Sequence, residues 1–178
     1  MRLFVAIQPD KGFLRALNAL QESLRKAGVV GKYLEPSNLH LTLAFIGEWA
    51  ENVTGLLPQV EKPFRLTLSH FGLFPKAGVL WVGVKPSKAL NRIAENVRHN
   101  LLEAGIPFDS KAFAAHITLV RKPYIPHSVD LAEIKVPQAT MTVKEICLYR
   151  SDHGERGMVY TVIGHSFSKA EGFIRCNP

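Results

Sequence analysis

The sequence predicts an α+β fold made of two related lobes with a cleft between them. This expectation rests on two amphipathic runs with helical spacing, several short runs with strand alternation, and an internal repeat that contains both. The first copy of the repeat reads VAIQPDKGFLRALNALQESLRKAGV, and the second reads VGVKPSKALNRIAENVRHNLLEAGI. Pro9 and Pro86 are 77 positions apart. We therefore expect residues 2–46 and 79–120 to be copies of one unit inside a single domain spanning 1–178.

Length, composition and charge limit what the chain can be. A chain of 178 residues with 47% hydrophobic and 21% charged residues is typical of a soluble globular domain. Because no apolar run is long enough, we expect neither a membrane span nor a signal peptide. Cys147 and Cys176 form neither a disulfide framework nor a metal-spaced set, which favours a reducing cytoplasm. The formal net charge of +7 favours an anionic partner, with nucleic acid or a nucleotide as the leading candidate.

Each copy of the repeat predicts one amphipathic helix after a short apolar strand. Asp10 and Ser87 are good N-caps, whereas Gly28 and Gly105 can take the left-handed conformation that ends a helix. The apolar positions recur at helical spacing in both runs: Leu14, Leu17, Leu20 and Leu24, then Leu90, Ile93, Val97 and Leu101. With one apolar stripe each, both helices should pack on a sheet.

The stretch NLHLTLAFIG, residues 38–47, has the period-two alternation of a half-buried strand. Leucines alternate with His40 and Thr42, so these two polar side chains lie on one face of the predicted strand. The same alternation puts Phe45 on the opposite face, and we expect it in the core rather than beside the histidine.

A second strand, AAHITLV at residues 114–120, repeats the pattern with His116 and Thr118. His116 follows His40 by 76 positions, so the two His-x-Thr triplets fall at equivalent points of the repeat. Two such triplets at equivalent positions favour a shared function over two ordinary strand histidines. A two-fold relation between the copies would face the two rings across one cleft.

The remaining segments complete the predicted order of elements. Four further runs read as strands, at 64–74, 79–84, 139–150 and 157–167. A short helix is expected over 51–62, although Gly55 and Pro58 oppose it. The three prolines of 121–137 predict a long surface connection.

Two facing imidazoles suit the displacement of a phosphate ester. Histidine titrates near neutral pH, so one ring can act as a general base while the other acts as a general acid. Two such groups are needed because the attacking and leaving oxygens lie on opposite sides of phosphorus. Thr42 and Thr118 point into the same cleft and can donate to the non-bridging oxygens. A zinc site does not fit the His-x-Thr spacing, and the lack of GxxxxGK[ST] and GxGxxG motifs disfavours an ATP-dependent ligase.

These motifs carry a resemblance to a known family. HLTL and HITL, together with RLFVAI, FIGE, GLFP, LWVGV, LYRS and GMVY, resemble the two-histidine phosphoesterase superfamily along essentially the whole chain. Within it the sequence is most similar to the bacterial and archaeal 2′-5′ RNA ligase family, usually described as RNA 2′,3′-cyclic phosphodiesterases. The resemblance implies two pseudo-symmetric lobes, each an antiparallel sheet with helices outside. It also implies an active-site cleft between the lobes and no metal or other cofactor.

The resemblance further implies a role for the motif residues, which are His40, Leu41, Thr42 and Leu43, then His116, Ile117, Thr118 and Leu119. By the family pattern, His40 is the proton donor and His116 is the proton acceptor. Thr42 and Thr118 hold the phosphate. Arg121 clamps it as well, unless this arginine is simply a basic strand end.

The implied reaction opens a terminal RNA 2′,3′-cyclic phosphate to a 2′-phosphomonoester, with 2′-5′ RNA ligase activity from the same groups. The expected substrates are RNA ends, tRNA fragments among them, and the protein is expected to be a cytoplasmic monomer that binds no membrane. Tyr149, Ser151 and Tyr160 are expected to border the site. Val120 and the tail after Phe167 depart from the family pattern.

Two alternatives stay open. The same chemistry would serve a phosphodiesterase of small cyclic nucleotides or 2′-5′ oligonucleotides, and the basic charge favours a polymer only mildly. The other alternative is a non-catalytic RNA-binding module, against which two intact motifs argue. His70 reads as an ordinary strand histidine and His99 as an exposed helix residue.

Overall fold

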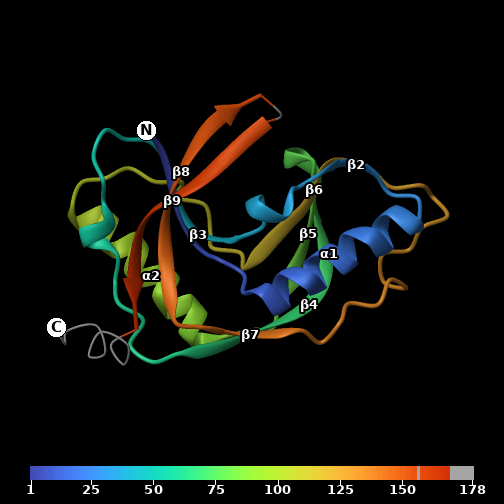
Figure 1. Cartoon of the computed structure of the whole chain (residues 1–178), viewed down its shortest axis with the longest axis horizontal. Coiled ribbons are helices and arrows are strands. Elements are labelled where there is room, and N and C mark those ends of the chain that lie inside the picture. Colours follow the sequence, from blue (N-terminus) through green and yellow to red (C-terminus); the bar gives the residue numbers. More distant parts are fainter. Residues whose placement is uncertain (156, 169–178) are drawn as a thin grey trace.

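The sheet of this protein is curled and antiparallel, and two helices pack on it (Figure 1). The computed structural model describes residues 1–155 and 157–168, so the tail noted after Phe167 lies outside the described residues apart from Ser168. Within these residues nine strands are ordered β7-β4-β5-β6-β3-β1-β8-β9, with β2 paired to β6. Every pairing between named strands is antiparallel. The predicted α+β class is confirmed.

The elements follow the chain in the order that the repeat predicts. The strands are β1 (Arg2–Ile7), β2 (Val30–Tyr33), β3 (Leu41–Glu48), β4 (Phe64–Phe74), β5 (Val79–Val84), β6 (His116–Tyr124), β7 (Thr140–Val143), β8 (Glu145–Gly154) and β9 (Gly157–Phe167). The helices are α1 (Lys11–Lys26) and α2 (Lys88–Glu103). The predicted strands at 64–74, 79–84 and 157–167 are confirmed with those bounds. The predicted order of strand, helix and histidine-bearing strand occurs twice, as β1-α1-β3 and as β5-α2-β6. That the two copies superpose stays a prediction.

Both helices form where their caps were expected. The side-chain oxygens of Asp10 and Ser87 accept hydrogen bonds of 2.7 and 3.2 Å from the backbone N–H three residues further on. Gly28 and Gly105 have φ values of 95° and 68°, a conformation that costs residues with a Cβ roughly 1–2 kcal/mol. Across residues 1–155 and 157–168, no helix is both long and apolar enough to span a bilayer.

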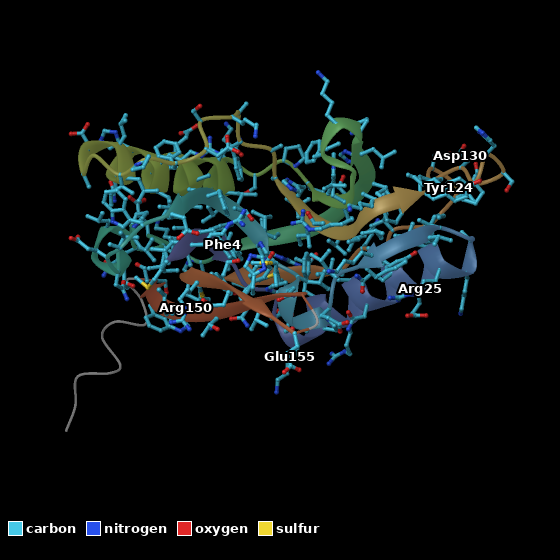
Figure 2. The ribbon with its side chains drawn as sticks, turned by 90° about the horizontal axis from the view of Figure 1, so that it is seen from above. Phe4, Arg25, Tyr124, Asp130, Arg150 and Glu155 are labelled. Atoms are coloured by element: carbon cyan, nitrogen blue, oxygen red, sulfur yellow. The ribbon has the colours of Figure 1, made fainter. Side chains whose placement is uncertain are left out.

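The sheet has two halves that meet where β3 pairs with β6. One half contains β3, β1, β8 and β9, and the other contains β6, β2, β5, β4 and β7. The joint is a single antiparallel pair, Leu41 with Ile117, and each of these residues directly follows a motif histidine. α2 packs against β3, whereas α1 packs against β6 and β7, so each helix covers the half that carries the other copy's histidine strand. The two helices lie on opposite sides of the molecule (Figure 2).

One side chain from each helix donates a hydrogen bond to the backbone of a histidine strand, β6 or β3. Gln21 of α1 is buried, and its Nε2 donates to Leu119 O of β6 (3.0 Å) and to Leu34 O (2.9 Å). Arg98 of α2 donates from Nε to Leu43 O of β3 (3.2 Å). The two donors are 77 positions apart and their two strand acceptors 76 apart, which are the offsets of the repeat. Each copy's helix therefore anchors the other copy's histidine strand.

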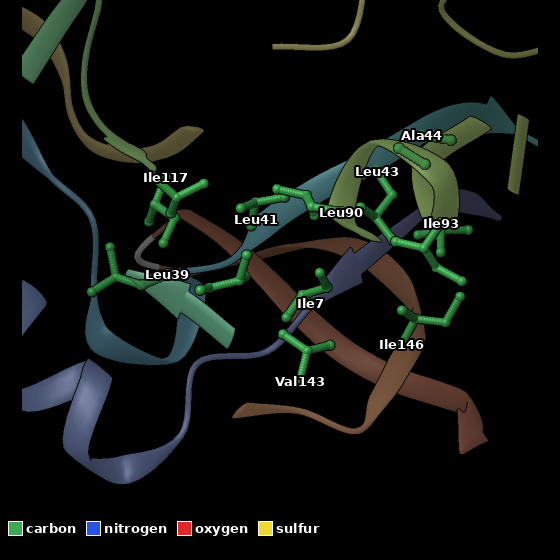
Figure 3. Close-up of a cluster of buried hydrophobic side chains, with 14 of the residues drawn as sticks. Ile7, Leu39, Leu41, Leu43, Ala44, Leu90, Ile93, Ile117, Val143 and Ile146 are labelled. Carbon is green, nitrogen blue, oxygen red and sulfur yellow. The ribbon is translucent and has the colours of Figure 1, made fainter. Parts of the chain in front are cut away.

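Apolar side chains of α2 pack against those of β3 (Figure 3). Leu90 and Ile93 of the helix are buried in one cluster with Leu41 and Leu43 of the strand. Burial of an aliphatic side chain of this size contributes about 1.5–3 kcal/mol relative to exposure. Because such cores are close-packed, the strand that carries Thr42 cannot shift without disturbing the helix.

The helix expected over 51–62 is wrong. A single 3₁₀ turn around Gly55 forms in this described segment. Gly55 disfavours a helix, and Pro58 lacks the N–H that a longer helix would use. The Asn52 side chain instead accepts hydrogen bonds from the backbone N–H and the hydroxyl of Thr54, at 2.8 and 2.6 Å.

Two other segments are divided differently from the prediction. The single strand expected over 139–150 is two strands, because the chain changes partners at Lys144. Before this residue β7 pairs with β4, and after it β8 pairs with β1. The surface connection expected over 121–137 begins only after Tyr124, since β2 pairs with β6 as far as that residue.

Loss of the Gln21 donor should destabilise the fold. In Gln21→Met, a side chain of similar length removes the donor to Leu34 O, while Leu119 O keeps only the Leu34 N–H, which should lower the free energy of unfolding by roughly 1–3 kcal/mol. Urea denaturation measures the change. The control Gln8→Met, at an exposed position, should stay within about 0.5 kcal/mol of the wild type. Equal stabilities of the two variants would contradict the anchoring role.

Candidate active site

The two motif histidines lie at the start of the paired strands. His40 comes immediately before β3, and His116 is the first residue of β6. The residues that follow them pair in antiparallel register, so each histidine is positioned across from the threonine of the other motif. The register therefore places Thr118 across from His40 and Thr42 across from His116.

Both imidazoles are oriented by the same backbone hydrogen bond. His40 Nδ1 lies 2.8 Å from Asn38 O, and His116 Nδ1 lies 2.7 Å from Ala114 O, in each case two residues earlier. A carbonyl oxygen can only accept, so Nδ1 carries the hydrogen in both rings. Nε2 of each ring is left as the atom that can take up or deliver a proton.

Each imidazole also packs against an aromatic side chain from the strand that opens its own copy of the repeat. The ring centroid of Phe4 is 4.7 Å from that of His40, and the Trp81 ring is 5.9 Å from His116. Tyr160 meets His40 edge-on at 5.2 Å. Phe4 and Trp81 were not expected at the site, although they are 77 positions apart and the offset of the repeat connects them.

The wall around His116 is built from β4 and β5. Phe74 meets the His116 ring edge-on at 4.9 Å. The Trp81 indole covers Gly72, where any Cβ would overlap it, so a glycine is required at this close approach. His70 is exposed, and its ring lies edge-on to Trp81 at 5.7 Å.

Phe45 lies on the histidine side, so the expectation that it faces the core is wrong. Between two consecutive residues of β1, the pairing on β3 steps from Thr42 to Ala44 and skips Leu43. This β-bulge inserts one residue and reverses the alternation beyond it. Phe45 thus joins Thr42 on a cavity wall, while Ala44 is buried.

A cavity of about 320 Å³ opens beside His40. It is lined by Arg2, Phe4, His40, Thr42, Phe45, Arg121, Ser151, Met158 and Tyr160. It brings together His40, Thr42 and Arg121 of the predicted site. Ser151 and Tyr160, two of the residues expected to border the site, also line it. Neither His116 nor Thr118 is among the residues that line it.

Some expected residues do not line this cavity, and some residues that line it were not expected. Tyr149 is buried behind it, with its ring stacked on Phe4 at 4.9 Å. Arg2 and Met158 line the cavity but were missed, and no pattern in the sequence points to them. His99 is exposed on α2, as predicted.

A second groove of about 280 Å³ continues from the cavity. The two share Arg121, Met158 and Tyr160. The groove is lined further by Lys32, Tyr33, Leu34, Glu35, Ser37, Asn38, Gly157 and Val159. Asn38 Nδ2 donates to Met158 O (2.8 Å), which ties the turn before His40 to β9.

Both imidazoles favour the neutral form in the free protein. The pKa of His40 falls from 6.5 to about 4, mainly because the ring is buried. The hydrogen bond to Asn38 opposes this change, whereas the charges of Arg121 and His116 add to it. Burial also lowers the pKa of His116, with Arg121 adding to the effect and the bond to Ala114 opposing it. An anion bound near the rings would raise both pKa values, because it favours the protonated imidazole.

The described residues hold one cluster of side chains with the spacing of metal ligands, and it lies outside the candidate site. It consists of Glu145, Cys147 and His165. Neither His40 nor His116 belongs to it. The expectation that the His-x-Thr motifs work without a metal stays a prediction.

Comparisons with known proteins connect this arrangement to a family. The family model described as the 2′-5′ RNA ligase superfamily matches residues 9–155. A protein of Archaeoglobus fulgidus named RNA 2′,3′-cyclic phosphodiesterase is 34% identical over 172 residues, covering 90% of this chain and 96% of the relative. The chain belongs to the 2′-5′ RNA ligase superfamily, as its motifs predict.

Two of the solved structures with the same fold are bacterial proteins. TT0787 of Thermus thermophilus is 31% identical with a TM-score of 0.74, covering 94% of this chain and 97% of that one. The apo form of LigT from E. coli is 26% identical with a TM-score of 0.78, covering 94% and 96%. With this coverage, the likeness extends over both halves of the sheet.

Removal of the Arg121 charge should raise the pKa of both imidazoles, since the guanidinium lowers each. We expect Arg121→Gln to move the titrations of His40 and His116 toward 6.5, as followed by NMR of the ring resonances. Inorganic phosphate should raise both pKa values in the wild type. The control Arg15→Gln, at an exposed position of α1, should leave them unchanged. The same pKa values in both variants would contradict the placement of Arg121 near the rings.

Proposed function

We propose that the protein is an RNA 2′,3′-cyclic phosphodiesterase that converts terminal 2′,3′-cyclic phosphates of RNA into 2′-phosphomonoesters. The observation that carries this proposal is the matching orientation of His40 and His116, each with Nδ1 bonded to a backbone carbonyl and Nε2 available. The name shared by several relatives, RNA 2′,3′-cyclic phosphodiesterase, supports the substrate. So does the formal net charge of +7, because phosphate contacts dominate the affinity for nucleic acids.

In this reaction His116 is the general base and His40 the general acid, following the family pattern. Nε2 of His116 removes a proton from water, which attacks phosphorus opposite the 3′ oxygen. Nε2 of His40 delivers a proton to the 3′ oxygen as its bond to phosphorus breaks, and the phosphate stays on the 2′ oxygen. Each proton transfer contributes about 10²–10⁴-fold in rate.

Binding of the anionic substrate favours protonation of His40 and so allows it to act as the general acid. With a pKa of about 4 the free imidazole is neutral at neutral pH, whereas a general acid must start protonated. The anionic cyclic phosphate offsets the burial of the ring and the charge of Arg121, so it favours the protonated form. Thr42 and Thr118 donate hydroxyl hydrogen bonds to the non-bridging oxygens, and Arg121 clamps the phosphate. The acid is therefore formed only when a phosphate is bound.

The same groups support 2′-5′ ligation as a side activity. A 5′-hydroxyl that takes the place of water gives its proton to His116 and is joined to phosphorus. His40 protonates the departing 3′ oxygen as before, and the product is a 2′-5′ linkage. By microscopic reversibility, the two groups also cleave that linkage.

The groove beyond the cavity favours RNA over a small cyclic nucleotide. It adds about 280 Å³ beside the cavity and carries the cationic side chains of Lys32 and Arg121. A polymer can place a second nucleotide and its phosphate there, whereas a mononucleotide beside His40 cannot fill both spaces. Small nucleotides are the second candidate, because LigT from E. coli has been solved in complex with 3′-AMP and with ATP.

Four finer expectations are part of this proposal. They are tRNA fragments among the substrates, a monomeric state, a cytoplasmic location, and a single bilobal domain built from two copies. The reciprocal contacts of Gln21 and Arg98 support the repeat. The free, buried thiol of Cys147 is compatible with a reducing compartment.

Replacement of either histidine should remove most of the turnover. His40→Ala and His116→Ala each delete one proton-transfer group, so we expect kcat to fall about 10²–10⁴-fold. The rates are measured on an RNA oligonucleotide ending in a 2′,3′-cyclic phosphate. His99→Ala, exposed on α2, is the control, and EDTA should leave wild-type turnover unchanged. Normal turnover in either variant would contradict the mechanism, as would activity lost with EDTA and restored by a divalent ion.

Lys32→Ala should selectively weaken the binding of long substrates. Loss of one phosphate contact should raise KM for the oligonucleotide and lower the slope of affinity against salt by about 1. KM for a nucleoside 2′,3′-cyclic phosphate should not change. Lys62→Ala, at an exposed position outside the groove, is the matched control. If Lys32→Ala behaves like this control on both substrates, the groove does not hold RNA. The result would then favour a phosphodiesterase of small nucleotides.

A further inference from the structure

Three side chains with metal-binding atoms converge on one face of the β8–β9 ribbon, outside the candidate active site. Cys147 of β8 pairs directly with His165 of β9. Glu145 lies two residues before Cys147 on the same strand, so its side chain points to the same face. The thiol is buried, whereas His165 is exposed and Glu145 is half-buried. The cluster can therefore be reached from solvent.

Two of the distances between the three ligand atoms are close to the edges of a coordination tetrahedron. Cys147 Sγ lies 3.6 Å from His165 Nδ1, and that nitrogen lies 3.1 Å from Glu145 Oε2. All three ligand atoms are within 4.8 Å of one another. Around zinc, bond lengths of about 2.3 Å to sulfur and about 2.0–2.1 Å to nitrogen or oxygen give tetrahedral edges of about 3.5 and 3.3 Å. A cation can thus be placed with small side-chain adjustments.

We propose that Glu145, Cys147 and His165 bind a borderline-soft divalent cation of the Zn²⁺ class, with water in the fourth position. A thiolate and an imidazole select such ions over Mg²⁺ or Ca²⁺, which prefer oxygen ligands. When the ion binds, the Cys147 thiol releases its proton to solvent and a metal–sulfur bond takes the place of S–H. Cys147 belongs to the buried cluster of Phe4 and Tyr149 behind His40, but none of the three ligands lines the cavity, and the site takes no part in the proposed phosphate chemistry.

An ion pair between His165 and Glu145 explains only part of the geometry. It accounts for the 3.1 Å contact but gives the thiol no role. In the hydrogen-bonded arrangement one ring nitrogen, with a single hydrogen, faces both the carboxylate and the sulfur. A divalent cation placed between them would use all three ligand atoms.

The surroundings hold the ligands in place. The Phe167 ring stacks on the His165 ring at 5.5 Å with an interplanar angle of 10°. Between these residues, Ser166 is buried and donates from its hydroxyl to Pro58 O (3.0 Å), which fixes the backbone of β9. A bound cation would tie β8 to β9, the two strands that supply Tyr149 and Tyr160 to the wall around His40.

Binding is tested with Co²⁺ and Zn²⁺ on the full chain carrying Cys176→Ser, so that Cys147 is its only thiol. We expect one Co²⁺ per chain with a thiolate-to-cobalt charge-transfer band, and displacement of Co²⁺ by Zn²⁺. His165→Ala, at an exposed position that should tolerate the change, should weaken binding at least 10–100-fold. Cys147→Ser should also remove the charge-transfer band. The matched control His153→Ala, exposed on β8, should bind like the parent.

Thermal unfolding gives an independent readout. Zn²⁺ at about 100 times its Kd should raise the Tm by roughly 5–10 °C, and EDTA should reverse the rise. Turnover of the cyclic phosphate should be the same with and without the ion, which separates this site from the catalytic proposal. The proposal is overturned if no thiolate band forms, or if His165→Ala and His153→Ala bind Co²⁺ equally.

Discussion

The pairing of β3 with β6 is the contact on which the candidate site depends. Its one register pair, Leu41 with Ile117, directly follows the two motif histidines. Without it the two halves of the sheet would not be joined, and one phosphate could not reach both rings. A single pair stabilises little, because a backbone hydrogen bond contributes about 0.5–1.5 kcal/mol net. The helices supply the remaining constraint, since Gln21 and Arg98 each hold the backbone of one histidine strand.

Burial then sets the charge state of the site. His40 and His116 are oriented identically, and both stay neutral beside Arg121 because their pKa values are lowered. Such a site has positive charge to offer an anion but no proton to give until the anion arrives. Binding of the phosphate and formation of the acid are therefore one event in the proposed mechanism. The rings of Phe4 and Trp81 strengthen this coupling, because they keep water away from the imidazoles.

The repeat made the helices, their caps and both histidine motifs predictable, because these features depend on local sequence and on the offsets of 76 and 77. Phe45 was misplaced because the β-bulge of β3 arises from its pairing with β1, which alternation within one strand does not encode. The split of 139–150 likewise depends on which half of the sheet each part joins. Phe4 and Trp81 could have been found, since the repeat relates them, but nothing local marks them as neighbours of the histidines.

The central claim is that His40 and His116 act together on one phosphate. A double-mutant cycle of kcat tests it most directly, with wild type, His40→Ala, His116→Ala and the double variant measured on one cyclic-phosphate oligonucleotide. If the two rings act as one unit, the double variant should be about as slow as the slower single variant, because loss of either ring already disables the paired transfer. If the two losses multiply in the double variant, the histidines act independently, which would contradict this account.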